Sequence, residues 1–338
     1  MKAIALTSLA AASLSFAATA QAQATPAASS VQLYGVVDVA FGASKPSGGV
    51  RNREVSSGNL TTSYIGFRGS EDLGGGLRAV FTLEHYLRLD TGEAGRYNGD
   101  SFWSRNANVG LSHTDFGLLR LGRIGTPLFT NTLMYNPLGA SFGFSPAIRN
   151  WFNTGKLSGD SGWNNAIGYS TPPLGGAVSV DLLHAMKETA QGGNDSVGVR
   201  FGNGGPFAAG AAWQRVKTAF ASGDETAWQL GASYDLRVAK LFAQYGRIDE
   251  AATGTANANT EDTITQLGVS VPVGVGAALL SWSQAETEGA LNYDRRFVTL
   301  GYDHRLSKRT DLYAMVMNDK LTGKSSGTGW ALGVRHGF

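Results

Sequence analysis

The sequence is constrained most by a long alternation of side chains that begins at Leu77. From Leu77 to Asp90 every second residue is apolar or a histidine, and the residues between them are mostly charged or polar. Because successive side chains of a β-strand point to opposite faces, this pattern predicts a strand with one apolar and one polar face. Residues 64–69 predict a second strand, joined to the first by a turn, residues 71–76, whose glycines accept positive φ. A long two-faced hairpin of this kind belongs either to a β-sandwich or to a membrane β-barrel.

Composition indicates a protein of many strands and turns. The 338 residues include 46 glycines and no cysteine, and charged residues make up 16% of the chain against a typical quarter. The absence of cysteine excludes a disulfide scaffold and a thiolate metal site. The net charge of +2 is spread evenly along the sequence, so no basic patch for a nucleic acid is indicated.

The N-terminus predicts export from the cytoplasm. A positive start at Lys2 precedes an apolar run of small residues, and Ala20-Gln21-Ala22 offers a cleavage site. Residues 1–22 are therefore predicted to be a secretory signal peptide, and residues 23–338 the mature chain. A transmembrane anchor is the rival interpretation, but the run holds many Ala, Ser and Thr residues and is barely long enough to cross a bilayer. No later segment reaches ~18 consecutive apolar residues, so the exported chain is either soluble or an outer-membrane β-barrel.

The alternation of the opening hairpin recurs along the mature chain and predicts sixteen strands. The predicted strands are Val31–Ala43, Tyr64–Gly69, Leu77–Asp90, Ser101–Thr114, Leu118–Ile124, Trp163–Thr171, Ala177–Lys187, Ser196–Asn203, Phe207–Thr218, Glu225–Arg237, Lys240–Asp249, Asp262–Val273, Val275–Thr287, Tyr293–Leu306, Thr310–Asp319 and Thr328–Phe338. Tight turns and longer polar loops alternate between them, and the longest connection is residues 125–162. One end of the sheet therefore carries turns and the other carries loops, which with an even strand count is typical of a bacterial outer-membrane barrel.

The two faces of these strands favour a membrane barrel over a sandwich. The second face is rich in Gly, Ser, Gln, Arg and Asp, which suits a water-filled lumen, whereas a sandwich needs one continuous apolar interior. About sixteen strands make a ring wide enough for an aqueous channel, and closure removes the unpaired edges that lipid cannot satisfy. Aromatic residues collect near strand ends, either as interfacial girdles or through ordinary β-propensity. The predicted fold is all-β, a 16-stranded antiparallel transmembrane β-barrel.

Five stretches carry a family resemblance that covers essentially the mature chain. They read SSVQLYGVVDVAF, GFRGSEDLGGGLRAVFTLE, NVGLSHTDFGLLRLGR, NAIGYSTPPLGG and the ending GWALGVRHGF. They resemble the trimeric general (diffusion) porins of Gram-negative outer membranes, especially the β-proteobacterial and neisserial branch. The resemblance implies a homotrimer among the lipid and lipopolysaccharide of the outer membrane, and a third loop, residues 125–162, that folds into the barrel and narrows it. It also implies that the outer-membrane assembly machinery reads the terminal Phe338, and that Asn106 and Asn108 point outward toward a neighbouring subunit.

The resemblance further implies a pore constriction in which wall arginines face acids on the inward loop. By position, one wall arginine matches Arg105, and the acid that ends the third-strand motif matches Glu84. The second wall arginine falls at Tyr64, and the third falls near Trp163. The chain therefore lacks two of the three arginines on which strong anion selectivity would rest.

The remaining constriction candidates come from strand faces and from the third loop. They are Arg68, Arg88, Arg123, Arg149, Lys156 and Asp160. Alternation places Glu84 on the polar face but Arg105 on the apolar face, a conflict that a β-bulge or a position above the membrane would resolve. Arg120 and Arg123 have opposite parity, and Arg123 is favoured as lumenal because it precedes the loop. For any one of these charges the alternative is a solvated side chain far from the narrowest point.

The sequence offers no support for catalysis. It contains no G-x-S-x-G, H-E-x-x-H or P-loop motif, and its five histidines are scattered over separate strands. We therefore predict a passive channel for small hydrophilic solutes and ions, with no enzyme activity, cofactor, metal or nucleic-acid partner. The alternatives are an outer-membrane adhesin or hydrolase that uses the barrel as a scaffold, and a soluble secreted β-sandwich.

Overall fold

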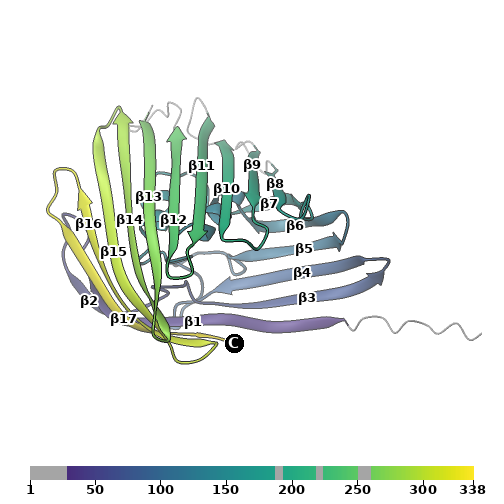
Figure 1. Cartoon of the computed structure of the whole chain (residues 1–338), viewed down its shortest axis with the longest axis horizontal. Helices are drawn as coiled ribbons and strands as arrows, with labels where there is room; N and C mark the ends of the chain where they lie inside the picture. The colour runs from purple at the N-terminus through teal and green to yellow at the C-terminus, as the bar shows by residue number, and fades with distance from the viewer. Residues whose placement is uncertain (1–28, 187–192, 218–223, 250–259) are drawn as a thin grey trace, which may run out of the picture.

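The computed structural model describes residues 29–186, 193–217, 224–249 and 260–338, and the predicted signal peptide lies outside these ranges. The described part holds 17 strands in a single sheet. The strands are β1 (Ser30–Ser44), β2 (Asn52–Ser57), β3 (Tyr64–Gly74), β4 (Leu77–Tyr86), β5 (Asn106–His113), β6 (Gly117–Gly125), β7 (Gly162–Ser170), β8 (Val178–Ala185), β9 (Asn194–Phe201), β10 (Phe207–Lys217), β11 (Asp224–Asp235), β12 (Lys240–Asp249), β13 (Thr260–Val273), β14 (Gly276–Gly289), β15 (Tyr293–Arg305), β16 (Thr310–Leu321) and β17 (Gly327–Gly337). Figure 1 shows these strands curling around a common axis.

The described strands occupy sixteen positions in a closed ring. Both β2 and β3 pair with β1, β3 along its first half and β2 along its second, so the two together fill one of these positions. Asp38, which is buried, fixes the segment of backbone between β2 and β3. Its Oδ2 accepts hydrogen bonds from the backbone N–H of Leu60 at 2.8 Å and of Thr61 at 2.6 Å. This ring confirms the predicted 16-stranded antiparallel barrel.

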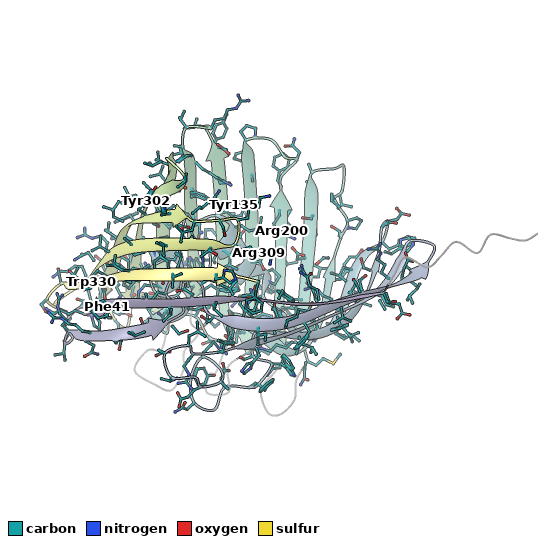
Figure 2. All side chains as sticks on the ribbon, turned by 90° about the horizontal axis from the view of Figure 1, so that it is seen from below. Phe41, Tyr135, Arg200, Tyr302, Arg309 and Trp330 are labelled. Atoms are coloured by element: carbon teal, nitrogen blue, oxygen red, sulfur yellow. The ribbon has the colours of Figure 1, made fainter. Side chains whose placement is uncertain are left out.

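Pairing of β1 with β17 completes the ring, and the two strands run side by side in Figure 1. At the seam, Gly35 and Phe338 exchange backbone hydrogen bonds of 3.3 and 3.1 Å. On the outside of the same strand pair, the rings of Phe41 and Trp330 pack edge to face, with 5.6 Å between their centroids (Figure 2). The first and last strands of the chain are therefore direct neighbours.

The two faces of the strands differ in the way that the alternation predicts. On β11, Leu230 is 52% exposed and Tyr234 is 45% exposed, whereas Gln229 and Ser233 on the other face are buried. On β12 to β15 the outward side chains are again mostly apolar and the inward ones mostly small or polar, apart from large apolar residues such as Ile248, Ile264 and Phe297 that pack against the third loop. An apolar outer surface of this kind fits lipid rather than water, which excludes the soluble β-sandwich.

Several strand boundaries differ from the prediction, most of all around the second loop, and one strand was missed. β4 ends at Tyr86 rather than at Asp90, and β5 begins at Asn106 rather than at Ser101. The residues between them form a second loop with backbone hydrogen bonds of its own, such as that from the N–H of Gly95 to the carbonyl of Tyr86 at 2.7 Å. β2 lies in a stretch predicted to be a polar loop, where no apolar alternation marks a strand.

The third loop, which connects β6 to β7, contains three short helices. They are α1 (Pro127–Met134), α2 (Pro146–Ile148) and the π-helix η1 (Arg149–Asn153). Thr126 caps α1 by accepting a hydrogen bond from the N–H of Phe129 at 3.1 Å, and Pro127 fits the first turn because no N–H donor is needed there. α1 contacts β9, β10 and β11, and α2 contacts β14 and β15.

None of the helices in the described part of the chain is long and apolar enough to span a membrane.

Leu128 and Trp151 anchor the third loop. Both are fully buried, and both belong to an apolar cluster with residues from β10 to β14. The wall residues of the cluster are Ala212, Ala227, Ile248, Ile264 and Ala285. Gly246 makes room for the indole, because a Cβ at that position would lie 2.9 Å from Cη2 of Trp151. Gly246 and the three alanines of the wall therefore allow the loop to pack closely against it.

Candidate functional site

Glu84 lies on the inner face of β4 and forms the centre of a polar cluster. Its carboxylate accepts a hydrogen bond from the Tyr34 hydroxyl at 2.7 Å and another from Asn106, and it pairs with Arg105 at 2.5 Å. The Arg105 guanidinium also stacks over the Tyr64 ring at 4.1 Å. The structure thus brings Tyr64, Glu84 and Arg105 together, and Glu84 balances the positive charge of Arg105.

Arg105 reaches the inner face because it precedes β5 instead of lying within it. It lies in the bend before Asn106, where the alternation of the strand has not yet begun, and its backbone N–H donates to the Glu84 carbonyl at 3.2 Å. The polar residues that follow point inward, contrary to the expectation that they face a neighbouring subunit. Asn106 bonds Glu84, and the buried Asn108 donates to the carbonyl of Arg123 at 3.0 Å. The polar face of β5 is therefore turned toward the lumen.

A second cluster joins the second loop to the third, and we call it the loop latch. Arg96 contacts Asp160 at 2.7 Å and Asp100 at 2.9 Å, and Arg123 contacts Asp160 at 2.5 Å. A polar cavity of about 360 Å³ opens beside these four residues. Sequence reasoning identified Arg123 and Asp160 as candidates but missed Arg96 and Asp100, because the loop that carries them has no periodicity.

The charges of the loop latch keep its carboxyl groups ionised. Burial raises the pKa of Asp100, but the hydrogen bonds and the charge of Arg96 outweigh burial and lower that pKa to about 2. Burial likewise raises the pKa of Asp160, and Arg96 and Arg123 outweigh it, so this pKa is also lowered. Both folded pKa values lie below the ~3.9 of an unfolded chain. The latch therefore contributes fully above about pH 4, and its contribution is lost as the pH falls toward 2.

We expect the second loop to resist pepsin at about pH 4 and to become cleavable as the pH approaches 2. The reason is that protonation of Asp100 and Asp160 removes the acceptors that hold Arg96. Cleavage would be followed by mass spectrometry in detergent and normalised to an unfolded substrate, because pepsin itself responds to pH. The variant Asp160→Asn should be cleaved already at pH 4. Equal resistance of the variant and the parent at pH 4 would show that the latch does not hold the loop.

Lys156 ties the third loop to β13 and β14. Its Nζ pairs with Asp262, donates to the Thr287 hydroxyl at 2.5 Å and lies 4.7 Å from the centre of the Tyr293 ring. Lys156 is only 4% exposed, and Asp262 is 2% exposed. This predicted constriction residue is thus an anchor of the loop, with its charge matched by a buried acid.

Arg149 is half-buried where the third loop meets β15. Its guanidinium donates to the carbonyls of Phe142 and Gly143 at 3.3 and 3.2 Å, and it stacks over the Phe297 ring at 4.9 Å. Burial lowers the pKa of Arg149 to about 10. The side chain therefore remains a cation at neutral pH.

The other predicted residues lie apart from Glu84. Trp163 packs in a buried apolar cluster on the wall. Arg88 pairs with Glu93 at 2.8 Å within the second loop. Arg68, further along the inner face of β3, donates to Gln32 at 2.9 and 2.8 Å. Across residues 29–186, 193–217, 224–249 and 260–338, no group of three or more His, Asp or Glu side chains is placed to hold a metal ion.

Comparisons with known proteins agree over the length of the chain. The family described as Gram-negative porin matches residues 5–324. Outer membrane porin protein 32 of Delftia acidovorans is 34% identical over 96% of this chain and 99% of its own length. Among solved structures, the anion-selective porin from Comamonas acidovorans has a TM-score of 0.78 and 31% identity, and the match covers 92% of this chain and 100% of that one. The trimer form of OmpT from Vibrio cholerae, at 15% identity, is similar in fold, with a TM-score of 0.68 and a match that covers 92% of this chain and 100% of that one.

Proposed function

This chain belongs to the family of Gram-negative porins, and we propose that its third loop narrows a water-filled barrel through which small hydrophilic solutes and ions diffuse. The protein is an outer-membrane pore. The observation that carries the proposal is the packing of Leu128 and Trp151 against inner-face residues of β10 to β14. A loop held on that face occupies part of the bore and leaves the wall around Glu84 to line the rest.

Planar bilayers containing the purified protein test the proposal directly. We expect stepwise increases in current as single pores insert, with ohmic conductance in potassium chloride. A pure, folded preparation that never forms pores would refute a diffusion channel. It would favour the alternative of a barrel that serves as a scaffold for an adhesin or a hydrolase. We propose no catalytic role, because the members of the family to which the chain belongs are channels.

We propose that Glu84 and Arg105 lie at the narrow part of the pore and together set a weak ion preference. A pore discriminates through the fixed charges at its narrowest part, and these two charges cancel. The similar solved structure is described as anion-selective. In this chain the pairing of Arg105 with the acid Glu84 argues for a weaker preference for anions.

Replacing Glu84 with glutamine should shift the selectivity of the pore toward anions, because Arg105 loses its counter-charge. Replacing Arg105 with glutamine should shift it toward cations, and the readout is the reversal potential in a potassium chloride gradient. The matched control is Glu288→Gln, which makes the same charge change at an exposed residue of β14. If the control moves the reversal potential as far as Glu84→Gln does, the two charges do not lie at the narrow part.

We also propose how the protein reaches its place and assembles there. Residues 1–22 would be removed on export, and the mature chain would form a homotrimer among the lipid and lipopolysaccharide of the outer membrane. Phe338 would be the residue that the assembly machinery reads. Its backbone pairing with Gly35 supports this role, because the terminal residue takes part in ring closure.

A further inference from the structure

An apolar groove crosses the outer face of the barrel at the seam of the ring. It has a volume of about 580 Å³ and runs over β15, β16, β17 and β1. Ala314 is its smallest outward side chain, and the strand register places Ala314 between Tyr302 on β15 and Leu332 on β17. Phe41 follows on β1, opposite Leu332, and both Phe41 and Tyr302 are labelled in Figure 2. The groove is therefore a depression over Ala314 between larger apolar side chains.

The groove runs from the turn end of the ring toward the middle of the bilayer. Its second row of side chains begins at His304, one residue before the end of β15, and passes over Leu312 and Val334 to Val39 in the middle of β1. Neighbouring strands lie about 4.8 Å apart, so this row spans about 14 Å. Because the strands of such barrels tilt by about 40°, a line across them runs obliquely through the bilayer. The span is close to one leaflet of a hydrocarbon core of about 30 Å, and so suits an acyl chain.

The turn at the lower end of the groove is basic. Residues 304–310, HRLSKRT, contain four basic side chains and no acidic one. The N–H groups of Leu306 and Ser307 donate to the carbonyl of Thr310 at 2.9 and 3.0 Å, which fixes the turn. Lys308 and Arg309 are exposed, and neither forms an ion pair with a residue in the described ranges. Two cations are therefore free at this end of the groove.

The acidic side chains that flank the turn point away from the groove. Asp303 and Asp311 both pair with Arg335 on the inner face, at 3.3 and 3.1 Å. On the outer face, the hydroxyl of Thr310 bonds His336 at 2.8 Å, which adds a further basic side chain to this surface. The outer face is thus positive where the groove begins, although the inner face of the same strands is balanced.

An apolar groove with cations at one end matches the chemistry of an anionic phospholipid. The apolar side chains match the acyl chain, and basic residues at a membrane surface attract anionic head groups by about 1 kcal/mol each. The short turns of an outer-membrane barrel lie on the periplasmic side, so the head group belongs to the periplasmic leaflet.

We propose that this groove binds one acyl chain of an anionic phospholipid of the periplasmic leaflet, and that Lys308 and Arg309 hold the phosphate of its head group. The bound chain covers the junction of β17 with β1 and contacts strands on both sides of it. The site lies on the outside of the barrel and does not depend on what passes through the pore.

Native mass spectrometry of the delipidated protein in detergent tests the site. Dioleoyl phosphatidylglycerol and dioleoyl phosphatidylcholine are titrated separately, since they share acyl chains and differ in net charge. We expect phosphatidylglycerol to bind at about a tenfold lower half-saturating concentration. The double variant Lys308→Gln with Arg309→Gln should raise that concentration about tenfold and leave phosphatidylcholine within about twofold. Ala314→Leu should weaken both lipids about threefold or more, because it fills the groove and removes packing contacts.

Two matched controls make the same chemical changes elsewhere on the barrel. Arg237→Gln with Lys240→Gln removes two cations from the turn between β11 and β12, and Ala243→Leu enlarges an exposed outward alanine of β12. Both should bind phosphatidylglycerol within about twofold of the parent. Equal weakening by the two charge variants, or unchanged binding of both lipids to Ala314→Leu, would overturn the site. So would an Ala314→Leu protein that loses its oligomeric mass but binds lipid normally, because the groove would then be an interface between copies of this chain.

Discussion

Replacing Lys156 with methionine is expected to free the third loop from the wall and to widen the pore. The change leaves Asp262 buried without its partner, and the loss of one member of a buried ion pair costs about 3–5 kcal/mol. The change therefore destabilises the docked state of the third loop, because Lys156 belongs to the loop whereas Asp262 and Thr287 belong to the wall. We expect a higher single-pore conductance, larger current fluctuations and faster proteolysis of the loop.

The double variant Lys156→Met with Asp262→Asn is the control for this prediction. Removing both charges avoids an unpaired buried carboxylate, so the double variant should be closer to the parent than the single variant is. Conductance and loop proteolysis are measured for all three proteins. Equal behaviour of the single and double variants would show that charge pairing is not what holds the loop.

Replacing Trp151 with alanine should loosen the same loop through packing. The indole is fully buried among Leu128, Ala227 and Ile248, and truncation of a buried tryptophan costs about 3–5 kcal/mol through lost contacts and the cavity left behind. The indole Nε1 has no hydrogen-bond partner among the described residues, so the loss is apolar. We expect the loop to undock part of the time, which would appear as stepwise current fluctuations between two conductance levels.

Trp151→Phe is the matched variant, because it keeps an aromatic ring at the same place. It should show fewer fluctuations than Trp151→Ala, and the two variants are compared by single-pore recording and by thermal unfolding in detergent. A Trp151→Ala protein with the steady conductance of the parent would mean that the ion pair of Lys156 holds the loop alone.

The barrel could be predicted from the sequence because the alternation of side chains within each strand shows which of its two faces is apolar. On β11, the alternation of Leu230 and Tyr234 with Gln229 and Ser233 needs no knowledge of distant residues. Such a pattern is local, and β2 shows its limit. That strand, Asn52–Ser57, has no apolar alternation and was taken for a loop, although β1 supplies its hydrogen-bonding partner.

The contacts of the candidate site are non-local, and for that reason the sequence predicted only some of them. The resemblance brought Glu84 and Arg105 into one cluster. Nothing local pairs Lys156 with Asp262, which lie in different parts of the chain and meet only after the ring has closed. Parity counting allowed only one of Arg120 and Arg123 to be lumenal, and Arg123 was favoured because it precedes the third loop. In the structure, a register irregularity between Gly122 and Ile124 breaks the count, and Arg120 lines an inner cavity.

The seam between β1 and β17 has a consequence for biogenesis. The residues that close the ring are far apart in the sequence, since Gly35 pairs with Phe338, so the last hydrogen bonds of the ring cannot form until β17 has been synthesised and exported. A truncated intermediate would present two bare strand edges, which the hydrocarbon of a bilayer does not tolerate. Insertion should therefore be nearly all-or-none, and a chain that lacks β17 should fail to insert stably.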